Sequence, residues 1–351
     1  MSTDAAAEST PRPGLAALTE DGWRHARRIA LASVAGLATA KLLGWPYGAN
    51  FAFYPIVLVG LVPALTLRAV VQFVGSSMAG IVIANLLVVL AQLSPVLATI
   101  VFFAVAARCF RMMAMDRGFL FHALTILSTS LLVHLATYSQ IVPRDLYTAH
   151  FLATLLSVVF SVLVYVWLPE RRAPILRDVD RTPALVNHRM LLGAICATAS
   201  YVAFQVIDLR DSLSAQAASV LVLFPMTLVG GRWAACTRVA GTLLGSAYVL
   251  AMQLLLYTHV TRVLLLLPIY AAGVTLFATL HVRENSGSAV GLSASTAVAV
   301  LVGQLAPSAD LYGISLYRFA SVFVAVCTML LCIYLTHAVL NRFEATRIPT
   351  T

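Results

Sequence analysis

Twelve apolar segments follow one another along this 351-residue chain, and few folds can accommodate them. Each is close to the twenty or so residues that an α-helix needs to cross the hydrocarbon core of a bilayer. They cover residues 24–43, 50–67, 69–92, 95–110, 119–140, 147–168, 189–207, 213–230, 237–257, 262–280, 288–306 and 316–340. Because 60% of the residues are hydrophobic and only 11% are charged, a soluble fold could not bury this surface. The sequence therefore predicts an all-α polytopic membrane protein with about twelve transmembrane helices.

The positive charges indicate how these helices are oriented. If the N-terminus is cytoplasmic, eighteen of the 23 Lys and Arg residues fall on the cytoplasmic side. Cytoplasmic loops retain Lys and Arg, so this asymmetry predicts that both termini are cytoplasmic. The arginines are scattered between apolar segments rather than gathered on one soluble face, which argues against nucleic-acid binding.

The apolar segments divide the chain into two six-helix halves, residues 24–168 and 189–340. A cytoplasmic linker, 169–188, is rich in Pro, Arg and Asp. Residues 1–23 read as a mobile cytoplasmic tail because they lack the charged-then-apolar order of a signal peptide. Residues 341–351 form a second cytoplasmic tail.

The two halves repeat one pattern at a spacing of 170 residues. The residues that align without a gap are Pro55 with Pro225, Arg68 with Arg238, Gly75 with Gly245 and Ser76 with Ser246. An even number of helices returns the chain to its starting side, so both halves have the same orientation. We therefore expect two parallel repeats about an axis along the membrane normal, with a transport pathway near that axis.

The stretch Arg-Val-Ala-Gly-Thr-Leu-Leu-Gly at 238–245 resembles the R-x-x-G-T-x-x-G signature of the fusaric acid resistance and aromatic acid exporter superfamily. Plant malate-type anion channels share the six-helix unit of that superfamily. Tyr317-Arg318-Phe319, before a long apolar run, is similar to the last helix of the unit. At 68–75 the Gly-Thr pair is replaced by Val71 and Gln72, so the first half departs from the signature.

The resemblance spans about residues 24–340 and is to a compact, two-half bacterial form. It implies export of organic anions, such as aromatic carboxylates, across a bacterial inner membrane. The partners it implies are the organic anion, the lipid bilayer and a periplasmic adaptor protein. The resemblance is compatible with a monomer and with a homo-oligomer.

Arg68 and Arg238 are the first candidates for substrate binding. Both are expected to begin the third helix of their half and to meet at one cytoplasmic mouth, where guanidinium groups can hold a carboxylate. The alternative is that they are arginines at helix ends whose side chains reach the interface. Four further candidates are polar or charged residues in or beside apolar segments: Tyr54, Gln72, Thr242 and Arg318.

No Asp or Glu lies at the middle of a predicted span, so candidates for proton coupling are histidines. His122 and His134 lie in the fifth span, and His150 lies near the start of the sixth. The alternative for each is a neutral histidine bonded between helices. Gly75, Gly80, Gly241 and Gly245 are expected to let helices approach closely.

The sequence has no Walker A motif, HExxH motif or nucleophile elbow, and its five cysteines lack metal-binding spacing. We therefore expect neither an enzyme nor a cofactor or metal. The leading interpretation is a secondary exporter of organic anions. Its rivals are a passive anion channel, which the lack of core carboxylates favours, and a non-transporting membrane subunit of an envelope efflux assembly.

Overall fold

The structure is a computed structural model that describes residues 18–62, 64–138, 141–169, 182–207, 213–256, 259, 262–284, 289–304 and 311–348. Over these residues the chain forms α-helices and one short 3-10 helix, and it forms no strand. The elements are α1 (Glu20–Leu42), α2 (Gly48–Leu61), α3 (Leu67–Leu93), α4 (Pro95–Ala114), α5 (Phe119–Ala136), α6 (Pro143–Trp167), α7 (Pro183–Val206), α8 (Leu213–Val222), α9 (Leu228–Leu256), α10 (Val263–Glu284), α11 (Val290–Gly303), α12 (Leu311–Leu340) and η2 (Glu344–Thr346). Each predicted apolar segment corresponds to one α-helix, which confirms the all-α class.

Eight of the described helices are long and apolar enough to cross a membrane: α3, α4, α5, α6, α7, α9, α10 and α12. Helices α2, α8 and α11 are apolar but shorter. Two of the short helices occupy matching places, since α2 and α8 are each the second helix of their half. The third, α11, is the fifth helix of its half, and its counterpart α5 is longer, with 18 residues. These lengths fit a polytopic membrane protein.

The boundary between α8 and α9 differs from the prediction. Helix α9 begins ten residues before Arg238, because Thr227 caps it by accepting a hydrogen bond from the Gly230 amide at 3.1 Å. In the first half the equivalent cap is Thr66, which accepts from the Ala69 amide at 3.2 Å. Arg68 therefore lies in the first turn of α3, as expected. The expectation that Arg238 begins its helix is wrong.

The two halves interlock rather than forming separate bundles. Helix α1 packs on α10, and its equivalent α7 packs on α4. Helix α2 packs on α11, and its equivalent α8 packs on α5. Within the halves α3 pairs with α5 as α9 pairs with α11, and α2 pairs with α6 as α8 pairs with α12. Exchanging the first half for the second leaves this set of neighbours unchanged, so the sequence repeat is also a repeat of packing.

Each half begins and ends at the same end of its helices. Arg28 near the start of α1 donates from Nε to the Leu168 carbonyl at 2.6 Å and from Nη2 to the Pro169 carbonyl at 2.8 Å, just after α6. In the second half His188 near the start of α7 donates from Nδ1 to the Thr346 carbonyl at 2.7 Å, just after α12. This closure is what the predicted even number of crossings in each half would produce.

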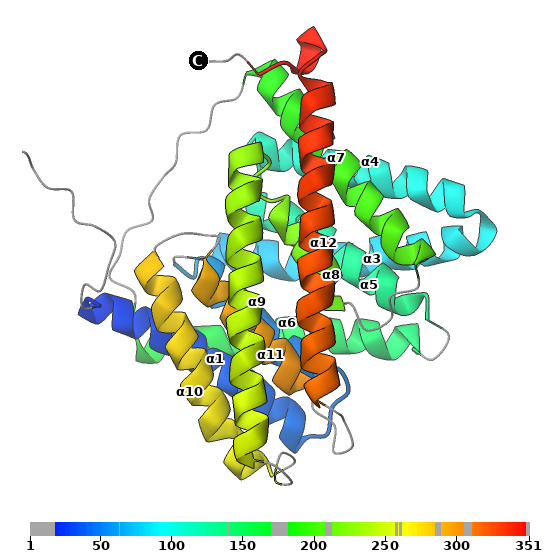
Figure 1. Ribbon diagram of the computed structural model, residues 1–351. Helices are drawn as coiled ribbons and strands as arrows, with labels where there is room; N and C mark the ends of the chain where they lie inside the picture. The colour runs from blue at the N-terminus through cyan, green and yellow to red at the C-terminus, as the bar shows by residue number, and fades with distance from the viewer. Residues whose placement is uncertain are drawn as a thin grey trace, which may run out of the picture.

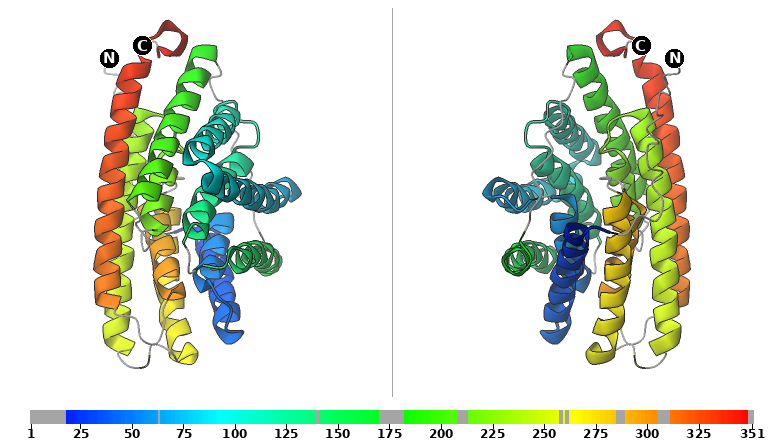
Figure 2. Two further views of the ribbon diagram at one scale, coloured as in Figure 1. Left: turned by 90° about the vertical axis from the view of Figure 1, so that its right-hand side faces the viewer. Right: turned by 90° about the vertical axis from the view of Figure 1, so that its left-hand side faces the viewer.

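The long helices of the two halves cross. Helices α9 and α12 run vertically in Figure 1, whereas α6 runs across them and is seen nearly end-on in Figure 2. At 1.5 Å per residue α6 and α9 are roughly 38 and 44 Å long, and each length exceeds the ~30 Å hydrocarbon core. The direction of the repeat axis stays a prediction.

The predicted linker and C-terminal tail are partly helical. Helix α7 begins at Pro183, so the end of the predicted linker 169–188 belongs to it, and residues 170–181 lie outside the described residues. In the C-terminal tail Thr346 is buried in η2, and the His188 bond ties it to α7. Residues 1–17 of the N-terminal tail also lie outside the described residues.

Candidate functional site

A cavity of about 50 Å³ lies inside the second half, among α8, α9, α11 and α12. Two arginines line it, Arg238 from α9 and Arg318 from α12, and Arg318 is only 6% exposed. The other polar lining residues are Ser214, Thr242, Ser246, Ser293 and Thr296. The apolar part of the wall includes Phe53 of α2 and Val322 of α12. The structure thus brings together three of the predicted substrate-binding residues, Arg238, Thr242 and Arg318.

Every polar side chain that the structure describes in this cavity can donate a hydrogen bond, and the two arginines can only donate. Arg238 donates from Nη1 to Thr296 Oγ1 at 3.3 Å, and Thr296 donates its own proton to the Ser293 carbonyl at 2.9 Å. Ser246 is 4% exposed, and its hydroxyl has no hydrogen-bond partner among the described residues. Among the described lining residues there is no Asp or Glu. A buried cation and an unused hydroxyl both gain from an anion between them.

Close packing of α9 on α11 directs the arginine toward the cavity. A Cβ atom added at Gly241 would lie 2.3 Å from Ser293 Cβ, and one at Gly245 would lie 2.8 Å from the Ala294 carbonyl oxygen. The two backbones therefore approach at a distance that only glycine allows. Arg238, Thr242 and Ser246 follow at intervals of four residues along α9, so they share one face. That face lines the cavity.

A smaller cavity, of about 10 Å³, lies at the equivalent place in the first half among α2, α3, α5 and α6. Its polar lining residues are Tyr54, Ser76, Ser77, Ser128, His150 and Thr154. Tyr54 Oη and His150 Nδ1 are 2.5 Å apart, and Thr154 donates to Ser77 at 3.1 Å. His150 is 2% exposed, and its Nε2 has no hydrogen-bond partner among the described residues. The cavity is polar but carries no arginine.

The two cavities are related by the repeat. Helix α5 contributes Leu124, Leu127, Ser128 and Leu131, and α11 contributes Ser293, Thr296, Ala297 and Val300, each 169 positions later. Ser76 and Ser246 are 170 positions apart, and His150 and Arg318 are 168 apart. Phe53 lines both cavities. Each half has a cavity at this place, and only the cavity of the second half has arginines among its described lining residues.

Four predicted residues lie outside both cavities. Arg68 is exposed at the start of α3, so it does not share the cavity that Arg238 lines. Gln72 accepts a hydrogen bond from the Phe121 amide at 3.3 Å, and His122 donates to the Gly118 carbonyl at 2.9 Å. His134 is buried, with its ring against Tyr138 and Phe204. Proton coupling through His122 or His134 stays a prediction.

The remaining two glycine candidates pack α3 against α5. A Cβ at Gly80 would lie 2.8 Å from Ser128 Cβ, and one at Gly75 would lie 3.3 Å from the Phe121 ring. The sequence interpretation omitted Ser293 and Thr296 of α11. The signal that could have identified them is the run Ser293-Ala294-Ser295-Thr296, three small polar residues in four positions inside the predicted span 288–306.

Comparison with known proteins concerns the first half. No curated protein and no solved structure matches the chain. Residues 25–164 match a family described as "Protein of unknown function (DUF2955)". The matched segment runs from α1 to the last turn of α6, so it coincides with one packing unit of six helices.

Proposed function

We propose that this protein is a secondary exporter of organic anions in a bacterial inner membrane, and that the cavity beside Arg238 and Arg318 binds the anionic group. The observation that carries the proposal is a cavity with two guanidinium groups and, among its described lining residues, no carboxylate. Arginine in a membrane helix is costly, and it usually marks a pathway or a ligand. The carboxylate of an organic acid would offset that cost by accepting hydrogen bonds from both arginines.

The size of the cavity limits what it holds in this conformation. About 50 Å³ is more than one water molecule needs and much less than the roughly 300 Å³ of a typical site for a small organic ligand. A carboxylate fits, whereas an attached aromatic ring requires the surrounding helices to separate. Loading of an aromatic acid is therefore expected to involve a conformational change, as carriers require.

The test is anion flux in liposomes that contain the purified protein. Labelled benzoate serves as the probe, and Arg238→Gln and Arg318→Gln are compared with Arg68→Gln, which removes an exposed arginine. The proposal requires flux in the parent that falls in the two cavity variants and persists in the Arg68 variant. Equal flux in all four proteins would contradict it.

The same assay separates the rivals. A proton uncoupler should abolish accumulation by an exporter, whereas a passive channel equilibrates the probe with or without it. A non-transporting subunit shows no flux until its partner is added. An associated periplasmic adaptor protein belongs to this proposal, and co-purification from the native membrane would test it.

A further inference from the structure

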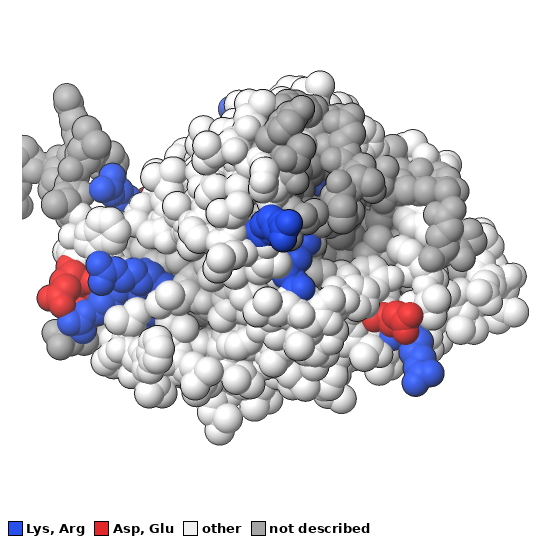
Figure 3. Space-filling view, turned by 90° about the horizontal axis from the view of Figure 1, so that it is seen from below, with Lys and Arg blue, Asp and Glu red and all other residues white. Residues whose placement is uncertain are grey.

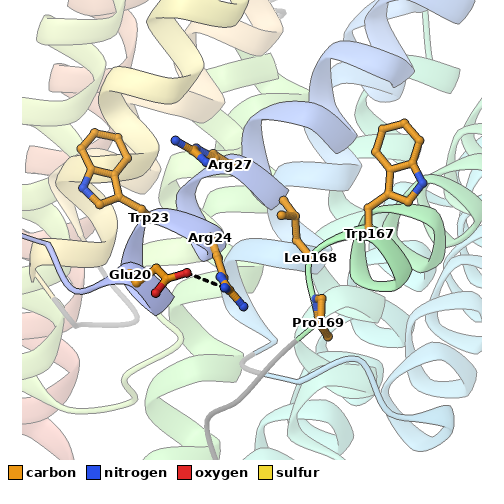
Figure 4. A pocket seen from close by; sticks show the side chains of 7 residues that line it. All are labelled: Glu20, Trp23, Arg24, Arg27, Trp167, Leu168 and Pro169. Atoms are coloured by element: carbon orange, nitrogen blue, oxygen red, sulfur yellow. Dashed lines mark hydrogen bonds and ion pairs between the residues drawn. The ribbon is translucent and has the colours of Figure 1, made fainter.

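A third site lies between the start of α1 and the end of α6, away from both cavities. It is a pocket of about 480 Å³ lined by Glu20, Trp23, Arg24 and Arg27 of α1, by Trp167 of α6, and by residues 168–169. Figure 4 shows the two indole rings on opposite sides, with the arginine side chains between them. We propose that this pocket binds the phosphate-bearing headgroup of an anionic phospholipid.

The charge of the pocket suits a single phosphate group. Arg24 forms an ion pair with Glu20, and the Arg27 side chain is exposed. The lining side chains that the structure describes therefore carry two positive charges and one negative charge. Guanidinium groups bind phosphate through two parallel hydrogen bonds, so a phosphate can engage Arg27 and compete with Glu20 for Arg24. Figure 3 shows basic side chains beside acidic ones at the left edge of the molecule, where α1 starts.

The neighbouring side chains indicate that the phosphate belongs to a lipid. Trp23 is 41% exposed and Trp167 is 80% exposed, and exposed tryptophans in membrane proteins lie at the level of the headgroups. Val159, Leu163 and Val166 of α6 are also exposed and follow one face of the helix away from the pocket. Acyl chains can lie along that face while the headgroup enters the pocket. A soluble phosphate has no acyl chains, so this apolar face of α6 would not strengthen its binding.

The pocket is held in shape before any ligand arrives. Arg28 is 1% exposed, donates to the carbonyls of Leu168 and Pro169, and stacks over the Tyr165 ring at 4.7 Å. These contacts fix the end of α6 against α1, so the two tryptophans stay on either side of the arginines. A headgroup therefore binds without paying for the ordering of the pocket.

Brominated lipids provide a direct test, because bromine quenches nearby tryptophan fluorescence. The protein carries Trp45→Phe and Trp233→Phe, so that Trp23 and Trp167 report alone. It is placed in vesicles of phosphatidylglycerol and phosphatidylcholine in which either lipid is the brominated one. The proposal predicts stronger quenching by brominated phosphatidylglycerol than by brominated phosphatidylcholine at the same mole fraction. Equal quenching would overturn it.

Three variants test whether the preference for phosphatidylglycerol arises in this pocket. Arg27→Gln should lower the relative preference for phosphatidylglycerol about fivefold, the loss expected for one basic residue near an anionic surface. Arg117→Gln, which removes an exposed arginine between α4 and α5, should leave it unchanged. Glu20→Gln should raise it because Arg24 loses its competing partner. Equal losses in the Arg27 and Arg117 variants, or a loss in the Glu20 variant, would overturn the proposal in favour of diffuse surface attraction.

A final arm separates lipid from soluble phosphate. Inorganic phosphate is added at constant ionic strength against chloride. The excess quenching should persist, because a free phosphate cannot replace a headgroup that is also held by its acyl chains. Loss of the excess would assign the pocket to a soluble phosphate and overturn the lipid assignment.

Discussion

His150 and Arg318 occupy the same place in the two halves. Each lies seven positions after the first residue of the sixth helix of its half, and each lines the cavity of that half. His150 contacts Tyr54, whereas Arg318 shares its cavity with Arg238. The described lining of the second cavity thus includes two arginines, whereas that of the first includes none. This difference is why the proposed function assigns the anionic group to the second half.

The first prediction is that Arg318→His, which copies the first half into the second, lowers anion transport at neutral pH. A histidine there loses the permanent charge and the planar fork of donors while keeping a polar side chain. Benzoate flux in liposomes should fall by at least about tenfold, in line with the roughly 1.5–3 kcal/mol of a hydrogen bond to a charged group. Unchanged flux would show that Arg318 does not contact the anion.

The second prediction separates Arg238 from its sequence equivalent. Arg238→Lys keeps the charge but loses the bidentate geometry, so carboxylate transport should weaken while folding is retained. Arg68→Lys should have no effect, because Arg68 is exposed and lines neither cavity. The two variants are compared in the same flux assay, with membrane expression as the check on folding. Equal losses of flux in the two variants would support the alternative that both arginines bind the anion at one cytoplasmic mouth.

The sequence predicted the helices well because each is an uninterrupted apolar run, and hydrophobic length is the main requirement of a bilayer. It misplaced the start of α9, because residues 231–236, between the predicted spans 213–230 and 237–257, belong to the helix. In the structure Gly230 and Gly231 lie in the first turn, where Thr227 caps the helix. That extension moves Arg238 from the helix end to a place within α9, where it lines a cavity that Arg68 does not reach.

The site itself could be predicted only in part. Arg238 stood out through the repeat and the resemblance, and Thr242 and Arg318 stood out as polar or charged residues in or beside apolar segments. Their meeting in one cavity depends on the packing of α9 against α11 and α12, which no spacing in the sequence reveals. Gln72 and His122 stood out for the same reason, yet their hydrogen bonds hold the start of α5.

The third prediction concerns the glycines between α9 and α11. Gly241→Ala places a methyl group 2.3 Å from Ser293 Cβ and 2.5 Å from the Val290 carbonyl oxygen, so the helices must separate. Overpacking of this kind costs about 1–3 kcal/mol, and the thermal unfolding temperature in detergent should fall.

Gly75→Ala is the matched control for that variant. Its added methyl would meet only the edge of the Phe121 ring, at 3.3 Å, and a side chain can turn aside where a backbone cannot. A Gly241 variant as stable as the Gly75 variant would mean that the two backbones are not in close contact.

The fourth prediction concerns topology. Arg28 ties the start of α1 to the end of α6, so reporter fusions after Arg181 should place the 169–188 segment on the cytoplasmic side together with the N-terminus. A fusion at the C-terminus should report the same side. A periplasmic signal from either fusion would require an odd number of crossings in one half.

The last prediction concerns the bonds that hold the C-terminal segment. His188 Nδ1 donates to the Thr346 carbonyl at 2.7 Å, so a neutral His188 must accept at Nε2. The donor there is His337 Nδ1, at 3.0 Å, and His337 Nε2 in turn accepts from Asn341 Nδ2 at 3.0 Å. Asn341 Oδ1 then receives the Ile348 amide at 3.2 Å. Every donor meets an acceptor only while both histidines are neutral.

His337→Phe removes two of these bonds and keeps a ring of similar size. The segment 341–348 should then be cut faster by a carboxypeptidase and should exchange its amide hydrogens faster. Hydrogen exchange in α12, which ends at Leu340, should be unchanged. Acidification of the parent should have the same effect, because a proton on His337 Nε2 would face the Asn341 amide nitrogen. Arg342→Gln is the control, since Arg342 lies in the same segment outside this chain of bonds. If proteolysis in the His337 variant matched that in the parent and the control, the histidine chain would not be what holds the C-terminus.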